Sequence, residues 1–228
     1  MSSEIWKVGQ EINAQSMFKN INDNGINGCW SVRGEVAAVK VLTQMCNQMT
    51  TEFDEILDDQ NEYLIEMENA DLNFENLKAD INEKIKQLYE EIKALEKKEQ
   101  NGSITEEEQE ELKSKKGELD ALMKDSDNKV EEQVNAVKSK GDEKIQSQKS
   151  KIAVAKNYGE VTVEKGTPLS ETEVSSGFFK KLFGCTGKSK KEAGEEAVEA
   201  GNNLLDKVTK SNDINDEIDK HYKNFKTT

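Results

Sequence analysis

The feature that most constrains the fold is a long apolar repeat between Val36 and Lys98, with steps that alternate between three and four residues. This is the a/d spacing of a coiled coil, sustained over many turns. A helix of this kind buries only a narrow apolar face, so it needs a partner helix. Gln60 is the one polar residue in the series. The apolar positions are Leu42, Met45, Met49, Phe53, Ile56, Tyr63, Met67, Ala70, Phe74, Leu77, Ile81, Ile85, Leu88, Ile92 and Leu95.

Turn-forming residues at 99–105 interrupt the repeat. Gly102 can adopt the left-handed conformation that often ends a helix. Ser103 with Glu106, and Thr105 with Glu108, each match the capping box that begins a helix. These signals predict that a second helix begins here and turns back along the first.

Folding the chain at residues 103–104 places the apolar residues of the two arms opposite one another. Leu95 then lies opposite Leu112, and Met67 lies opposite Gly141. Gly117 and Gly141 each weaken the second arm by roughly 1 kcal/mol relative to alanine. We therefore expect the second arm to need cover from another part of the chain.

The pattern divides the chain into four segments. We predict an N-terminal head and loop at 1–33, a long antiparallel helical hairpin at 34–157, an irregular linker at 158–191 and a C-terminal helix at 192–226. The linker is expected because two glycines and Pro168 interrupt the helical pattern. The expected fold class is all-α: an elongated antiparallel coiled-coil hairpin with an additional C-terminal helix and a short N-terminal helical head. The apolar positions of the last helix are Ala193, Ala197, Gly201, Leu204, Leu205, Val208, Ile218, Tyr222 and Phe225.

Composition restricts the classes of binding partner and the cellular compartment that we expect. The net charge of −14 disfavours nucleic acid, because an acidic surface repels phosphates. The three cysteines are an odd number without a CxxC motif, which predicts reduced thiols. No basic start with an apolar run marks a signal peptide, and no apolar stretch approaches the ~20 residues of a membrane span. We expect a cytoplasmic protein, or one secreted without a cleavable signal peptide.

Motifs for catalysis or cofactor binding are incomplete. Residues 182–189 end in the Gly-Lys-Ser of a phosphate-binding loop, but Leu182 stands where the motif needs glycine. Residues 23–34 resemble a calcium loop, but Gly34 stands where a bidentate glutamate is needed. His221 is the only histidine and cannot by itself supply a conventional metal site or catalytic triad. We expect no catalytic residue, no cofactor and no metal, and hence not an enzyme.

A basic and aromatic segment is the candidate contact site. It comprises Phe178, Phe179, Lys180, Lys181, Leu182 and Phe183. These residues are suited to a membrane interface, where aromatics enter the headgroup boundary and lysines meet anionic lipid. The interpretation that we favour is that they cover the open end of the hairpin. The sequence thus predicts a non-enzymatic structural or protein-interaction protein that binds partners through its hairpin, and the alternative is a leaderless secreted or membrane-associating helical protein.

Liposome co-sedimentation separates these two functions. If residues 177–191 contact lipid, the full chain should sediment with anionic vesicles, and changing Phe178, Phe179 and Phe183 to Ser should abolish that binding. Failure of the unaltered chain to sediment would eliminate the lipid function.

Overall fold

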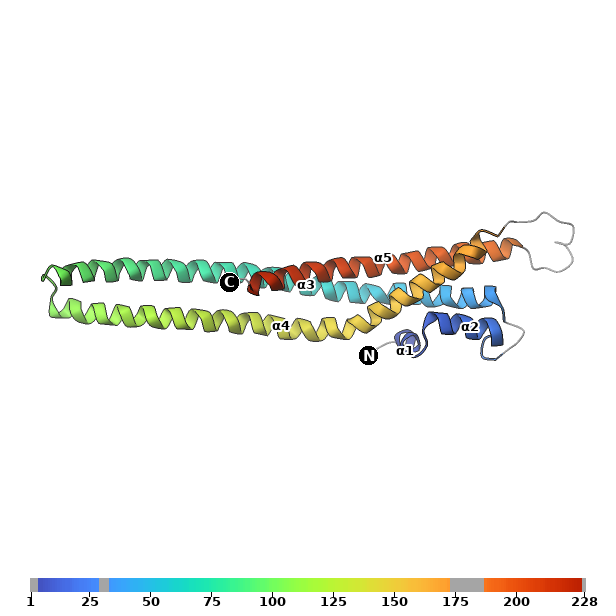
Figure 1. The fold of residues 1–228 in the computed structure, drawn as a ribbon, viewed down its shortest axis with the longest axis horizontal. Coiled ribbons are helices and arrows are strands. Elements are labelled where there is room, and N and C mark those ends of the chain that lie inside the picture. Colours follow the sequence, from blue (N-terminus) through green and yellow to red (C-terminus); the bar gives the residue numbers. More distant parts are fainter. Residues whose placement is uncertain (1–3, 29–32, 173–186, 227–228) are drawn as a thin grey trace. The chain divides into compact units, whose positions relative to one another are not determined.

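The computed structural model describes residues 4–28, 33–172 and 187–226. Within these ranges the chain forms helices and no strand, so the predicted all-α class is confirmed. The helices are α1 (Glu4–Glu11), α2 (Ala14–Asn24), α3 (Glu35–Gln100), α4 (Glu106–Ser170) and α5 (Gly187–Lys226) (Figure 1). The contacts divide the chain into a first unit, Met1–Glu62 with Glu143–Glu217, and a second unit, Tyr63–Asp142 with Ile218–Thr228.

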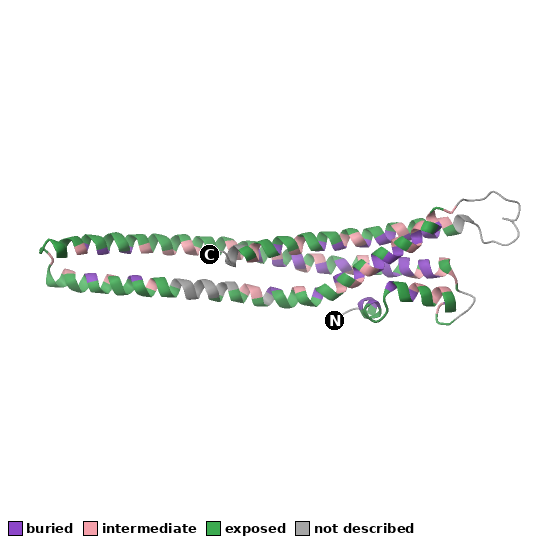
Figure 2. Ribbon diagram, in the orientation of Figure 1, coloured by how far each residue is buried: buried purple, intermediate pink, exposed green. Residues whose placement is uncertain are grey.

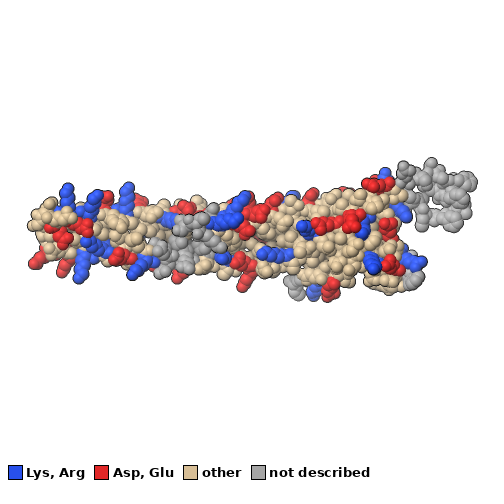
Figure 3. Space-filling model, in the orientation of Figure 1, with Lys and Arg blue, Asp and Glu red and all other residues tan. Residues whose placement is uncertain are grey.

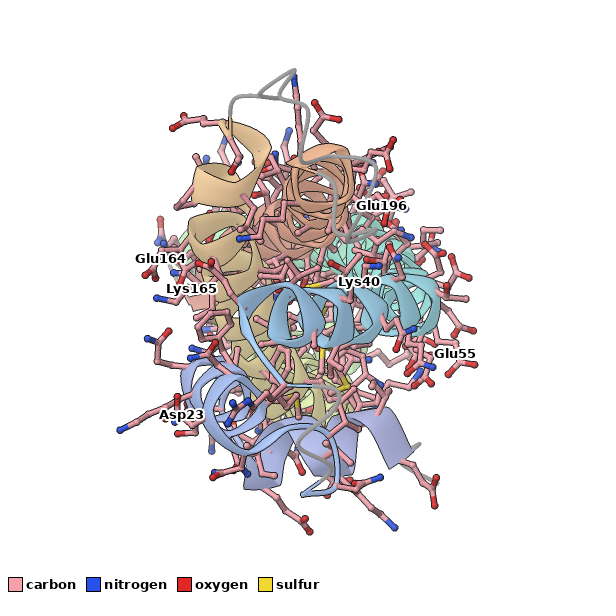
Figure 4. The ribbon with its side chains drawn as sticks, turned by 90° about the vertical axis from the view of Figure 1, so that its right-hand side faces the viewer. Asp23, Lys40, Glu55, Glu164, Lys165 and Glu196 are labelled. Atoms are coloured by element: carbon pink, nitrogen blue, oxygen red, sulfur yellow. The ribbon has the colours of Figure 1, made fainter. Side chains whose placement is uncertain are left out.

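The first unit contains the larger apolar core, and Figure 2 shows its buried residues on helix faces that point toward other helices. Charged side chains such as Lys40, Glu55 and Glu196 lie on the outside of its helices (Figure 4). The fully or almost fully buried members of this core include Trp6, Ala14, Leu42, Cys46, Met49, Phe53, Ala155, Tyr158 and Leu204. Helices distant in sequence therefore share one core.

The N-terminal head is more helical than the predicted head and loop at 1–33, because α1 and α2 cover most of it and the turn-forming residues Asn20, Asn22 and Asn24 lie within α2. Asn13 caps α2, and its side-chain oxygen accepts a hydrogen bond from the Ser16 N–H at 2.8 Å. The head is also anchored to α4. Asn157 Oδ1 accepts from the Ala14 N–H at 3.0 Å, and Tyr158 Oη donates to the Ile12 carbonyl at 2.7 Å. A cap and tertiary contacts thus outweigh the turn preference of asparagine.

The prediction of an irregular linker at 158–191 is wrong at both ends, since α4 continues through Ser170 and α5 already begins at Gly187. Tyr158, Val161 and Leu169 are buried along this extension, so apolar packing stabilises it. Pro168 lies in its last turn and has no N–H to donate to the Glu164 carbonyl, so the apolar packing maintains the helix despite the proline.

Glycines that look like helix breakers are instead points of close helix contact between α4 and α5. A Cβ at Gly201 would lie 2.9 Å from the Gly159 carbonyl oxygen, and one at Gly166 would lie 3.0 Å from the Gly194 carbonyl oxygen. The two contacts are one heptad apart on each helix. The backbones can approach this closely because glycine carries no side chain.

Polar positions of two helices also meet inside the first unit. Gln60 interrupts the apolar repeat of α3, and its Nε2 donates to Asn215 Oδ1 of α5 at 3.2 Å. Gln60 is 1% exposed, and Ser211, one turn before Asn215, is fully buried. Gln60 Oε1 and Ser211 Oγ have no protein hydrogen-bond partner. Because sliding either helix would bury these groups against apolar residues, this layer favours one register.

In the second unit, α3 and α4 are joined by the turn at residues 101–105. Gly102 has φ +64°, and the Ser103 N–H donates to the Lys98 carbonyl at 3.0 Å. Thr105 and Glu108 form a capping box, with N–H to side-chain distances of 3.1 and 3.2 Å. Beside the turn, Leu88, Ile92, Leu95, Leu112 and Leu119 form an apolar cluster. The cluster includes two residue pairs expected from folding the chain at 103–104, Leu95 with Leu112 and Leu88 with Leu119.

The two glycines of α4 in the second unit have different surroundings. Gly141 lies against the Tyr63 ring, which occupies the space that any larger residue would need. Tyr63 therefore takes the place opposite Gly141 that the sequence assigned to Met67. Gly117 has no heavy atom within 4 Å of a built Cβ. Only Gly141 is needed for packing.

The open space at Gly117 and the close helix contact at Gly201 predict opposite effects of substitution by alanine. Gly117→Ala should raise the free energy of unfolding by about 0.5–1 kcal/mol, because alanine favours the helix and meets nothing. Gly201→Ala should lower it by about 1–3 kcal/mol, because the added methyl group forces α4 and α5 apart. Urea unfolding followed by circular dichroism measures both. A stabilised Gly201→Ala variant would contradict the close helix contact.

Candidate functional site

A groove lies between α3 and α4 of the second unit, close to the turn. Its volume is about 570 Å³, and its apolar floor consists of Ile92 and Leu119, both more than nine-tenths buried. Tyr89 lines the groove and is 53% exposed. The remaining lining residues are Glu90, Lys93, Glu96, Lys116 and Asp120. Figure 3 shows basic and acidic side chains interspersed along these helices near the turn.

The groove follows one flank of the hairpin. Lys116 Nζ lies 2.7 Å from Glu96 Oε1 on this flank. Tyr89 is one heptad before Glu96, and Met123 is one heptad after Lys116, so antiparallel packing places Tyr89 and Met123 on the same flank in the next layer. Met123 is 46% exposed. Tyr89 therefore lines the groove, and Met123 lies exposed on the same flank beyond the residues that line it.

The opposite flank of the hairpin is polar at the equivalent layers. Lys98 Nζ lies 2.6 Å from Glu108 Oε1, and one heptad away Lys115 Nζ lies 2.6 Å from Glu91 Oε2. Exposed ion pairs of this kind contribute little to stability but keep a surface hydrated. The apolar exposure beside the turn thus belongs to the groove flank.

A second cluster of functional groups joins α5 to the hairpin in the second unit. The hydroxyl groups of Tyr63 and Tyr222 are hydrogen-bonded to each other, and Tyr63 Oη also donates to the Val137 carbonyl at 3.4 Å. His221 Nδ1 lies 3.0 Å from Asp71 Oδ2. Burial raises the pKa of Tyr63, and the hydrogen bond with Tyr222 raises it further. Burial also raises the pKa of Tyr222. These contacts fix the end of α5 against α3 and α4.

The titratable groups offer little for chemistry. In the described ranges, no group of three His, Cys, Asp or Glu side chains is arranged to hold a metal ion. Cys46 is fully buried and lies 3.1 Å from Thr162 Oγ1, and burial raises the pKa of its thiol to about 11. A thiol of this kind stays protonated at neutral pH and is a weak nucleophile.

The contact site predicted from sequence, Phe178–Phe183, lies outside the residues that the structure describes. Its contact with lipid stays a prediction. Most of the incomplete phosphate-binding motif also lies outside them, and Gly187 begins α5. None of the described helices is both long and apolar enough to span a membrane.

Comparisons with protein families, with curated proteins and with solved structures find no match. An all-α fold by itself does not define a function, because similar helical folds serve many functions. The groove is the feature from which a function can be argued.

The apolar repeat did not predict Tyr89 and Met123 as contact residues, because neither belongs to it. The pairing of residues between the two arms of the hairpin does indicate them. Once Leu95 is paired with Leu112, the positions beside the core can be paired as well, and Tyr89 with Met123 is the layer on the groove flank where both are apolar.

The tyrosine pair predicts a pH dependence of stability. The folded protein holds the hydroxyl protons of Tyr63 and Tyr222 more tightly than the unfolded chain does. The free energy of unfolding should therefore fall as the pH rises above about 10. Tyr63→Phe should lower stability at neutral pH by about 0.5–1.5 kcal/mol and reduce that alkaline loss. Tyr89→Phe is the matched control, because its hydroxyl is exposed. Equal alkaline loss in both variants would contradict this role of Tyr63.

Proposed function

We propose that this chain is a non-enzymatic interaction protein that binds a protein helix in the groove beside Tyr89 and Met123. The observation that carries the proposal is the exposure of Tyr89, 53%, beside an apolar floor, with Met123, 46% exposed, on the same flank. An amphipathic helix laid into a groove of this kind buries its apolar face there, which is a recurring mode of protein recognition.

Burial of the exposed halves of Tyr89 and Met123 would supply one part of the binding energy. Full burial of a large apolar side chain contributes about 1.5–3 kcal/mol. Tyr89 is also a residue type enriched among the few residues that dominate interface energetics. Tyr89, with Ile92 and Leu119 beside it, provides the centre of an interface.

The charges around the groove favour a protein over a polyanion. Lys93 and Lys116 alternate with Glu90, Glu96 and Asp120. Nucleic acid or an anionic membrane would need a basic surface. Charges of both signs instead suit a protein helix that carries both.

Photo-crosslinking tests the proposal. A photoreactive amino acid at position 89 should give a discrete covalent adduct with a protein in cells that make the chain. The same amino acid at position 84 should give none, because Lys84 is exposed one heptad before Glu91 on the opposite flank. Met123→Asp should abolish the adduct at position 89. Absence of any adduct at position 89 would overturn the proposed function.

A further inference from the structure

The chain contains three Asn-Gly sequences, at residues 24–25, 27–28 and 101–102. We propose that one of them, Asn27-Gly28, is a site of spontaneous deamidation, and that the folded structure protects the other two. An asparagine followed by glycine is open to this reaction because glycine has no Cβ to hinder its backbone nitrogen from approaching the asparagine side chain. The three sites share this local chemistry, so a difference in rate between them comes from the fold.

The reaction needs water and no other co-reactant. The Gly28 nitrogen loses its proton to hydroxide or water and bonds to Cγ of Asn27, while the bond from Cγ to Nδ2 breaks and the side-chain nitrogen takes up a proton and leaves as ammonia. Water then opens the cyclic imide at either of its two carbonyl carbons. The product is aspartate, or isoaspartate if the side-chain carboxyl group carries the link to Gly28. One water is consumed, one ammonia is released, and nothing is oxidised or reduced.

The structure holds the other two glycine nitrogens in backbone hydrogen bonds. The Gly25 N–H donates to the Ile21 carbonyl at 2.9 Å at the end of α2, and the Gly102 N–H donates to the Glu99 carbonyl at 3.0 Å. Each of these bonds must break before the nitrogen can give up its proton and turn toward the asparagine side chain. Deamidation at Asn24 and Asn101 is therefore slowed.

Asn27 and Gly28 lie in an exposed turn beyond α2. Their φ angles are +52° and +74°, and positive φ at two successive residues is the pattern of a type I′ turn. The hydrogen bond of such a turn joins its first and fourth residues, so it does not use the N–H of the second central residue, here Gly28. Among the described residues, no backbone carbonyl accepts a hydrogen bond from the Gly28 N–H. A Cβ built at Gly28 would meet nothing within 4 Å, so water and hydroxide can reach this peptide bond.

The expected difference in rate follows from the strength of one hydrogen bond. Such a bond contributes roughly 1 kcal/mol net, which corresponds to a factor of about five in rate. We therefore expect Asn27 to deamidate about fivefold faster than Asn24 or Asn101, or more, in the folded chain. In the unfolded chain the three rates should be similar, because the hydrogen bonds are lost and the same dipeptide remains.

Peptide mapping by mass spectrometry tests the site in the purified full chain. The chain is incubated at mildly alkaline pH, with and without guanidinium chloride, and the deamidated fraction at each of the three asparagines is followed over time. Most of the product from the folded chain should carry the change at Asn27, and guanidinium chloride should bring the three rates together. A folded chain in which Asn24 or Asn101 deamidates as fast as Asn27, or in which Asn27 stays unmodified, would overturn the proposal.

Two matched variants give an independent readout. Each deamidation adds one negative charge, so ion-exchange chromatography separates the modified chain from the unmodified one. Asn27→Gln should remove most of this acidic form, because the longer side chain closes a ring far less readily, and Asn101→Gln should leave it unchanged. Loss of the acidic form in Asn101→Gln but not in Asn27→Gln would place the modification in the turn of the hairpin and contradict the proposal.

Discussion

Coverage of the apolar face of α3 is the constraint on which the rest of the structure depends. A long helix with a narrow apolar face is not stable alone in water, because most helix stability comes from packing that face. In the first unit, residues of α1, α2, α4 and α5 pack in the same core as α3. Near the turn, the described cluster consists of α3, α4 and Ile104. Two helices enclose less of an apolar face than several do, which is why the groove lies there.

Small residues determine how closely the covering helices approach. Gly159 and Gly166 of α4 meet Gly201 and Gly194 of α5 at backbone distance. Glycine within a helix costs roughly 1 kcal/mol relative to alanine. That cost is offset where it allows two backbones to pack closely. At Gly117 no such contact exists, so the cost remains.

Buried polar groups give this helical core its register. Apolar faces of helices are similar to one another, and sliding by one heptad leaves many contacts intact. Gln60 with Asn215, and Tyr63 with Tyr222, find their partners in only one arrangement.

The sequence by itself determined the helical class, the long first helix and the turn. These follow from local rules: periodicity, caps and glycine conformation act over a few residues and can be read without the fold. The sequence could not show that Gly159 and Gly166 lie within a helix, because glycine is a breaker unless another backbone lies beside it. Nor could it show that the polar interruptions at Gln60 and Asn215 face each other across 155 residues. The groove is intermediate: Tyr89 and Met123 are visible in the sequence, but their exposure depends on which faces of α3 and α4 are covered. Tertiary structure decided these points because each depends on residues that lie close in space and far apart along the chain.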